Sequence, residues 1–174
     1  ETGTRFNYSN RVIASYASVS GEVKNWFTFR AGLRAEFYTY SLEGINNEMN
    51  YTSSADNLFP SVHLSRELND RHRFGLSYSR RVNRPDEWQL CPVIYSADIY
   101  EMKTGNPYLL QSLVDSYELS YLFSEDKVQL NTELYYRDSH DPIGSFLLET
   151  DDRFVETYDN LDREINSGIE LMGT

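Results

Sequence analysis

Apolar and polar residues alternate with a period of two along most of the chain. Between residues 26 and 40, one row of positions is apolar and the row between them is polar. Because successive side chains of a β-strand point to opposite faces, this alternation predicts a strand with one apolar and one polar face. The apolar row is Phe27, Phe29, Ala31, Leu33, Ala35 and Phe37, and the polar row is Thr28, Arg30, Gly32, Arg34 and Glu36.

The same alternation recurs along the chain and predicts about seven long strands. Several of the alternating runs exceed the five or six residues of an ordinary strand, whereas a strand that crosses a bilayer needs roughly nine to eleven. Arg80 interrupts the apolar row of one run. The predicted strands cover 26–40, 73–84, 113–123 and 127–137, with less regular alternation at 10–19, 58–68 and 153–172.

The predicted connections alternate between short and long. They are short at 20–24, 69–72 and 124–126, and long and polar at 41–57, 85–112 and 138–152. Short turns at one end and long loops at the other are typical of outer-membrane barrels, as are aromatic residues near strand ends. We therefore expect an all-β fold, an antiparallel up-and-down meander that is part of a large transmembrane β-barrel. The alternative is a soluble β-sandwich, which also alternates.

Composition and motifs exclude several functions. The net charge of −11 disfavours nucleic acid as a partner, because phosphate backbones repel an acidic chain. No nucleophile has a base at a recognisable spacing, and no glycine-rich phosphate loop is present. His63, His72 and His140 lie in different segments, and Cys91 is the only cysteine, so the sequence offers no metal-binding spacing. We expect no enzymatic activity, no cofactor and no metal site.

Five short motifs follow one another along the chain. They are AGLRAE at 31–36, LFPS at 58–61, YSRRVNRP at 78–85, GNP at 105–107 followed by YEL at 117–119, and Asn160 followed by GIE at 168–170. Each resembles a motif of TonB-dependent receptors. Their order and spacing, from about Phe6 to Leu171, resemble the β-barrel domain of these receptors, within the outer-membrane protein β-barrel family abundant in Bacteroidetes. Cys91 and Gln111 depart from the residues that the family often has nearby, Asn and Pro.

The resemblance implies a location, a function and partners. Residues 1–174 are then a segment of one transmembrane barrel domain, with the plug domain, coupling box and signal peptide outside the sequence. Such a barrel has roughly 22 strands around a plug. The expected function is a wall segment of an energy-coupled importer of a siderophore, vitamin, glycan or peptide in the outer membrane of a Gram-negative bacterium. The expected partners are outer-membrane lipid, the rest of the barrel with its plug, the TonB complex through that plug and, as an open option, a surface lipoprotein. The alternative is a non-transporting barrel that serves as an adhesin or scaffold.

Within such a barrel, the two rows of each strand face different surroundings. The polar row meets a wet lumen and the apolar row meets lipid. We predict that Arg30, Arg34, Glu36, Glu118 and Glu133 face the lumen, and that Phe27, Phe29, Leu33, Leu119, Tyr121 and Leu130 face lipid.

Two regions carry residue types that suit ligand binding. Arg80, Arg81 and Arg84 flank Asn83, and guanidinium groups suit anionic ligands; equally, they suit structural pairs with acidic loops or lipopolysaccharide. The aromatic residues of the 85–112 loop suit sugar or peptide capture, or packing against other loops. The candidate ligand-binding residues are Arg81, Arg84, Trp88, Tyr95 and Tyr100.

Overall fold

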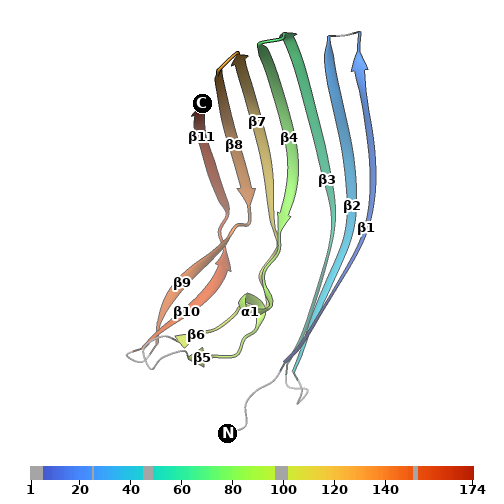
Figure 1. Ribbon diagram of the computed structural model, residues 1–174. Helices are drawn as coiled ribbons and strands as arrows, with labels where there is room; N and C mark the ends of the chain where they lie inside the picture. Colours follow the sequence, from blue (N-terminus) through green and yellow to red (C-terminus); the bar gives the residue numbers. More distant parts are fainter. Residues whose placement is uncertain (1–5, 25, 45–48, 97–101, 151–152) are drawn as a thin grey trace.

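The computed structural model describes residues 6–24, 26–44, 49–96, 102–150 and 153–174. Its main feature is an antiparallel sheet of seven long strands that follow one another in chain order (Figure 1). This arrangement confirms the predicted all-β, up-and-down meander. The strands are β1 (Phe6–Val23), β2 (Phe27–Gly44), β3 (Asn50–Asn69), β4 (His72–Asn83), β7 (Ser112–Glu125), β8 (Val128–His140) and β11 (Arg163–Gly173).

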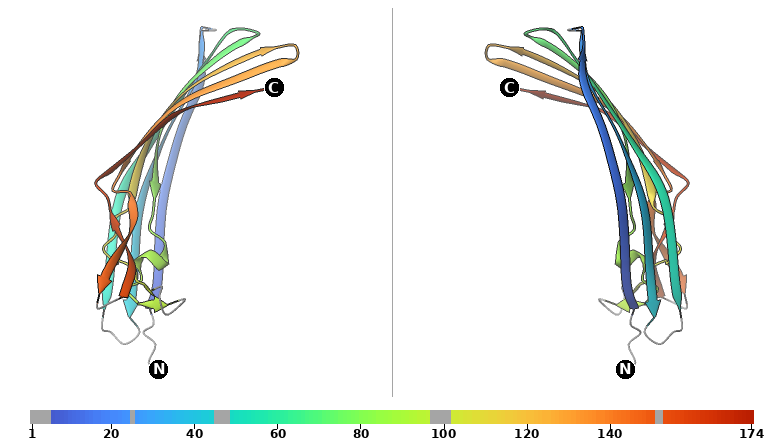
Figure 2. Two further views of the ribbon diagram at one scale, coloured as in Figure 1. Left: turned by 90° about the vertical axis from the view of Figure 1, so that its left-hand side faces the viewer. Right: turned by 90° about the vertical axis from the view of Figure 1, so that its right-hand side faces the viewer.

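The main sheet forms a bent and twisted wall, with β1 and β11 at its two ends in the strand order (Figures 1 and 2). Its strands are between 11 and 20 residues long. All of them therefore reach the roughly nine to eleven residues that a bilayer requires. The right-handed twist of strands explains why such long ribbons curve rather than lie flat.

Tight turns join the strands at the end of the wall that is uppermost in Figure 1. Lys24, between β1 and β2, and Asp126, between β7 and β8, adopt positive φ angles of 45° and 42°. Tight hairpin turns need this left-handed conformation. In the third turn, the Asn69 side-chain oxygen accepts the backbone N–H groups of Arg71 and His72, at 3.0 and 3.1 Å. The predicted short connections are therefore confirmed as turns, and β1, β3 and β7 run further toward them than expected.

At the opposite end, the structure corrects two predicted loops. The 41–57 segment is mostly strand, because β2 and β3 stay paired as far as Glu43 and Asn50. The 138–152 segment contains β9 (Ile143–Thr150), and the last predicted strand, 153–172, is divided into β10 (Arg153–Asn160) and β11. These extensions carry apolar residues that pack at the loop end, such as Leu42 and Ile143, so the strands continue beyond the regularly alternating part of the sequence.

β8, β9, β10 and β11 belong to one long interrupted hairpin. His140 pairs with Arg163, and Ile143 pairs with Asn160, so the register is the same on both sides of the break. The interruption falls at residues 141–142 and 161–162, where Asp141 has a φ angle of 52°. Pro142 has no N–H to give to a ladder, but its carbonyl still accepts the Leu161 N–H at 2.8 Å, so the regular ladder is interrupted while the two chains stay linked.

The 84–111 segment contains its own secondary structure and joins this hairpin. It holds the short helix α1 (Glu87–Leu90) and the two-residue strands β5 (Tyr95–Ser96) and β6 (Met102–Lys103). β6 pairs in parallel with β10, which completes a four-stranded sheet in the order β5-β6-β10-β9. Among the residues that the structure describes, no helix is long and apolar enough to cross a membrane.

The buried apolar core lies at the loop end and not along the length of the wall. Tyr38 and Tyr40 of β2 pack with Leu90 of α1 and Leu109. Tyr8, Ile143 and Tyr158 cover this cluster in part. The core therefore connects the wall to the loops and leaves most of the sheet with no second layer.

Candidate functional site at the two faces and the loop end

The pairing register places each of the predicted lumen and lipid residues on one face of the sheet. Arg30 lies opposite His63, His63 opposite Ser77, and Ser77 opposite Glu118. Glu133, opposite Ser120, and Arg34 and Glu36, in the same row of β2 as Arg30, lie on this face too. We call it the polar face; it carries all five residues that were predicted to face a lumen.

The other face, which we call the apolar face, carries all six residues that were predicted to face lipid. Its clearest row crosses six strands, with each residue opposite the next: Phe29, Leu64, Leu76, Leu119, Leu134 and Ile169. Phe27, Leu33, Tyr121 and Leu130 occupy equivalent positions in their strands.

No layer covers the apolar face in the described part of the chain. Leu76 is 51% exposed and Ile169 is 67% exposed. A sandwich would bury this face against a second sheet, so the structure excludes that alternative. An apolar surface of this extent needs a non-aqueous neighbour.

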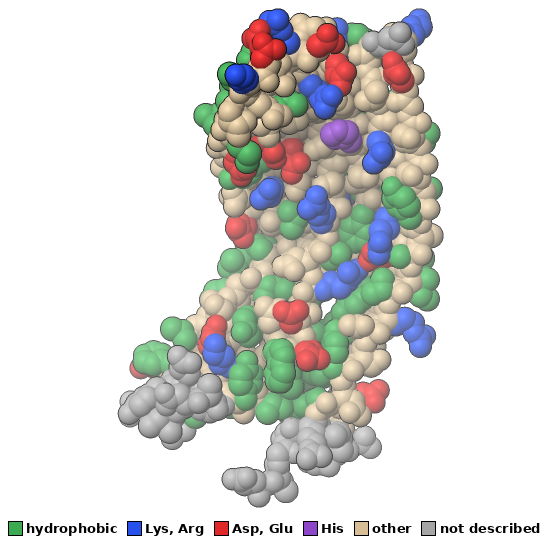
Figure 3. Space-filling model, viewed as in Figure 1, with side chains coloured by type: hydrophobic (Ala, Val, Ile, Leu, Met, Phe, Trp, Pro, Cys, Tyr) green, Lys and Arg blue, Asp and Glu red, His purple; other side chains and the backbone are tan. Residues whose placement is uncertain are grey.

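The polar face carries charged side chains over the strands and apolar ones near the loop end (Figure 3). At the border between the two zones, Glu36 is only 4% exposed. Arg34 and Arg84 both donate to its carboxylate. The Arg84 guanidinium also lies over the Tyr38 ring, 4.7 Å from its centroid. Because a buried carboxylate without partners is costly, this pairing ties the start of the 84–111 segment to β2.

Hydrogen bonds attach the rest of the 84–111 segment. The Tyr40 hydroxyl donates to the Pro107 carbonyl at 2.8 Å in a buried site. The Asn106 side-chain amide donates to the Tyr158 carbonyl at 3.0 Å. Burial raises the pKa of the Tyr158 phenol. Three segments thus hold one another at the loop end of the wall.

Asn160 is the most connected of these side chains. Its amide nitrogen donates to the carbonyls of Leu110 and Asp141, at 3.1 and 2.7 Å, and its oxygen accepts the Leu110 N–H at 2.8 Å. Gly105 is required for a different reason, because a Cβ there would lie 2.6 Å from backbone atoms of Cys91. Sequence reasoning assigned no role to Asn106, Gly105 or Asn160, although their motifs marked them.

The basic residues 80, 81 and 84 do not form one cluster. Arg80 lies on the apolar face, opposite Asp115, whereas Arg81 lies exposed on the polar face, opposite Val114. Arg84 is held by Glu36. Of the predicted ligand-binding arginines, Arg81 thus has an exposed side chain on the polar face, and Arg84 has a structural partner.

The aromatic candidates of the loop differ in their placement. Trp88 is exposed on α1, and its ring lies 6.0 Å from that of half-buried Tyr95 in an edge-on arrangement. Tyr100 lies outside the described residues. Sequence reasoning left Tyr108 out of the candidates; its exposed ring meets the Tyr51 ring edge-on at 5.4 Å.

Three polar atoms on buried parts of this region have no hydrogen-bond partner within the described residues. They are the Asn57 amide nitrogen, the Arg84 Nε and the Gln111 amide oxygen. Asn57 lies opposite Glu36 in the sheet. Buried polar groups in folded proteins nearly always have partners, so these three atoms are exceptions among the described residues.

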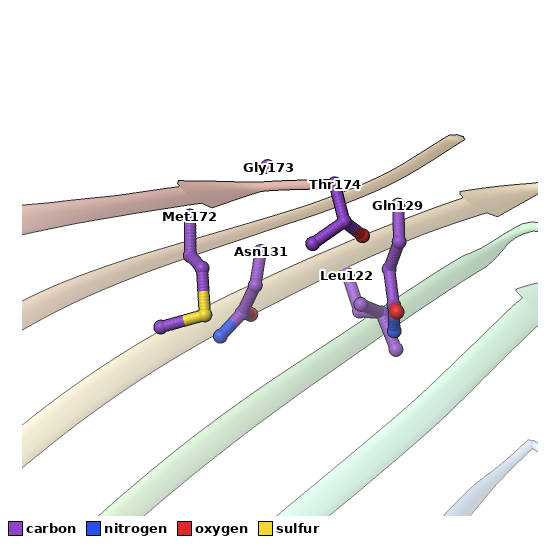
Figure 4. A pocket seen from close by; sticks show the side chains of 6 residues that line it. All are labelled: Leu122, Gln129, Asn131, Met172, Gly173 and Thr174. Carbon is purple, nitrogen blue, oxygen red and sulfur yellow. The ribbon is translucent and has the colours of Figure 1, made fainter. Parts of the chain in front are cut away.

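A separate hollow lies near the turn end of the polar face (Figure 4). Its lining contains no titratable side chain, and in the part of the chain that is described no group of three His, Cys, Asp or Glu residues is arranged to hold a metal ion. We therefore assign no chemistry to it. The lining residues are Leu122, Gln129, Asn131, Met172, Gly173 and Thr174.

Comparison with known proteins decides the family. A model of the outer membrane protein beta-barrel family matches residues 1–174. The chain belongs to this family. The match confirms the resemblance of the motifs and places the protein in the outer membrane of a Gram-negative bacterium. No curated protein matches the chain.

Several solved structures of larger outer-membrane proteins share the fold of this chain. The siderophore receptor PirA from Pseudomonas aeruginosa has a TM-score of 0.62 at 13% identity, over 98% of this chain and 40% of PirA. The hemophore receptor HasR of Serratia marcescens has a TM-score of 0.74 at 14% identity, over 94% of this chain and 31% of HasR. The copper transporter OprC has a TM-score of 0.76 at 13% identity, over 95% of this chain and 26% of OprC. This chain therefore spans less than half the length of each of these proteins. At such low sequence identities, the similarity shows the fold alone.

Proposed function

We propose that this chain is a wall segment of a TonB-dependent outer-membrane receptor that imports a scarce nutrient. The observation that carries the proposal is the apolar row that runs across six strands next to a polar row on the opposite face, combined with turns at one end and structured loops at the other. In this proposal the apolar face meets lipid and the polar face lines the lumen. The remaining strands and a plug domain come from the rest of the protein.

The dimensions of the apolar face support a lipid environment. On β2 the apolar row runs from Phe27 to Phe37. Ten residues of strand span about 34 Å, or about 24 Å along the membrane normal at a tilt of 45°, which matches the apolar band of about 25 Å in such barrels. Aromatic residues mark the turn end of this face, where Phe74 packs on Tyr121 with ring centroids 4.8 Å apart.

The polar face supports contact with a plug. Asn57 lies opposite Glu36 in the sheet, and Arg84 donates to Glu36, so polar groups gather on this face. A polar protein surface that enters the lumen supplies partners for the accessible polar side chains of this face, because polar groups that become buried require partners. Arg30, Arg34, Glu118 and Glu133 are the charged residues that we expect to line the rest of this path.

The loop end supports ligand binding on the outer side. Arg81, Trp88 and Tyr95 are the residues that we propose for it. Arg81 offers a guanidinium for anionic groups, and the two rings offer flat apolar surfaces. The fixed core beneath α1 presents Trp88 on a rigid support, which lowers the entropic cost of binding. Tyr100 stays a candidate on sequence alone.

The test is whole-cell uptake by the full-length protein in its own host. Strains with the gene, without it and without tonB are given labelled ferric siderophores, cobalamin, oligosaccharides and peptides in turn. We expect uptake of one class to fall to background in both deletion strains, and Trp88→Ala to raise the half-saturating concentration. If the protein reaches the outer membrane and no class depends on it, the chain belongs to a non-transporting adhesin or scaffold.

A further inference from the structure

Two arginine–carboxylate pairs lie on the apolar face. Arg80 donates its Nε and Nη2 hydrogens to the two oxygens of Asp115, at 2.9 and 2.8 Å. Arg163 binds Asp138 in the same two-pronged way, at 2.7 Å for each contact. The register places Asp115 opposite both Arg80 and Asp138, and Arg163 opposite His140. These five residues therefore form one charged band across β4, β7, β8 and β11.

The charged band borders a row of tyrosines. Tyr78, Tyr117 and Tyr136 lie opposite one another on β4, β7 and β8, two residues closer to the turns than Arg80, Asp115 and Asp138. Their ring centroids are 5.0 and 6.2 Å apart, and the Tyr78 hydroxyl donates to Asp115 at 2.7 Å. Two residues further toward the turns comes the leucine row. The face thus changes from aliphatic to phenolic to charged toward the loop end.

The exposed part of the charged band is cationic. The side chains of Asp115 and Asp138 are only 8% and 15% exposed, whereas those of Arg80 and Arg163 are 37% and 52% exposed. Each guanidinium has five N–H donors, and the contact with its carboxylate uses two of them. The carboxylates therefore fix the two guanidinium groups, and three N–H donors of each group take no part in the contact with the carboxylate. His140 adds a half-exposed ring 4.0 Å from Asp138.

We propose that Arg80 and Arg163 bind the phosphate groups of phosphorylated glycolipids in the outer leaflet. The inference rests on the proposed function, because it requires lipid against the apolar face and the loops on the outer side. Guanidinium groups bind phosphate oxygens in two-pronged contacts, and tyrosines suit the level of the headgroups. The occupant is a lipid and not a soluble anion, because a bound lipid places its phosphate on the band and its acyl chains over the tyrosine row and the leucine row beyond it.

The test measures binding of bisphosphorylated lipid A to the full-length receptor in detergent, by native mass spectrometry. The Arg80→Gln/Arg163→Gln variant is compared with Arg81→Gln, which removes the neighbouring arginine on the opposite face. A third variant, Arg80→Gln/Asp115→Asn, leaves no unpaired carboxylate and controls for folding. We expect the dissociation constant to rise about tenfold in the first variant, by about threefold or more in the third and less than twofold in Arg81→Gln.

Two further arms identify what is bound. Dephosphorylated lipid A should bind wild type and the double-arginine variant equally, and inorganic phosphate should not compete with lipid A at millimolar concentration. Three results would overturn the inference. The double-arginine variant could lose affinity for the dephosphorylated lipid as much as for lipid A, inorganic phosphate could compete fully with lipid A, or the double-arginine variant could bind lipid A as wild type does. If the variants lose lipid A while uptake persists, the transport proposal stands independently. If wild type binds no lipid along this face, both proposals fail.

Discussion

The two faces of the main sheet differ by a single residue step along each strand. The row Phe29, Leu64, Leu76 and Leu119 is wholly apolar, and the neighbouring row Arg30, His63, Ser77 and Glu118 is wholly polar. A shift of one residue in register would exchange the two environments for an entire strand. Alternation therefore determines which face each side chain occupies. Whether that face meets water, lipid or protein must be inferred from what covers it.

Burial of the two faces is the reverse of that in a soluble protein, in which the apolar face is buried and the polar face is exposed. The polar face carries the helix and the buried core, with Glu36 and Leu42 almost fully enclosed, while the apolar face is left bare. Figure 2 shows α1 on the side toward which the upper hairpins lean. An inverted pattern of burial is stable only where hydrocarbon replaces water outside the wall. The predictions below test this inversion from the strongest expected effect to the weakest.

The largest effect is expected from a charge placed on the apolar face. Leu119→Arg should destabilise the full-length receptor by about 2–4 kcal/mol, because a guanidinium is then forced into the bilayer midplane. Asn131→Arg, on the polar face of β8, should change stability by less than about 1 kcal/mol. Urea unfolding in lipid vesicles measures both. Equal losses for the two variants would show that the faces do not meet different media.

A smaller effect is expected where the polar face is covered. Arg84→Gln removes one of the two cationic partners of buried Glu36, and should cost about 1.5–3 kcal/mol, the value of a hydrogen bond to a charged group. Hydrogen exchange at residues 87–90 should accelerate, because α1 loses its attachment to β2. Arg81→Gln is the matched control and should leave exchange there unchanged. Similar acceleration in the control would remove the assigned role of the Arg84–Glu36 contact.

Asn160→Ala should weaken the contact between the 84–111 segment and β10. This substitution deletes three hydrogen bonds to backbone groups of Leu110 and Asp141, and we expect a loss of about 1–2 kcal/mol. Limited proteolysis should then cleave the 105–111 segment faster. Asn166→Ala, at an exposed position of β11, provides the control. Unchanged cleavage in Asn160→Ala would mean that the core, rather than Asn160, holds the segment.

The weakest effect concerns a single hydroxyl. Tyr40→Phe keeps the ring in the core and deletes the bond to the Pro107 carbonyl, so we expect a loss of about 0.5–1.5 kcal/mol. Tyr16→Phe, at an exposed position on the same face, should be neutral. Thermal unfolding of the two variants side by side measures the difference. A neutral Tyr40→Phe would indicate that the Pro107 carbonyl gains another partner when the hydroxyl is lost.

The sequence allowed prediction of the strands and of the face of each residue, because period-two alternation reports local geometry. It did not predict the β9–β10 extension, because the apolar residues Phe146, Leu147 and Leu148 are consecutive and do not alternate with polar ones. Nor did it predict the pairing of β6 with β10, which joins residues about fifty positions apart. Arg80 appeared as an interruption of its row. Its partner, Asp115, lies on a different predicted strand, and only the register shows that the two are opposite each other.

The most direct measurement is the accessibility of spin labels at two adjacent residues of β2. Leu33→Cys and Arg34→Cys are labelled in the full-length receptor in vesicles, with Cys91→Ser and any other cysteine replaced. Apolar oxygen should relax the label at residue 33 strongly while a water-soluble nickel complex does not reach it, and residue 34 should show the opposite preference. A residue-33 label that the nickel complex relaxes, or that neither reagent reaches, would contradict the assignment of this face to lipid.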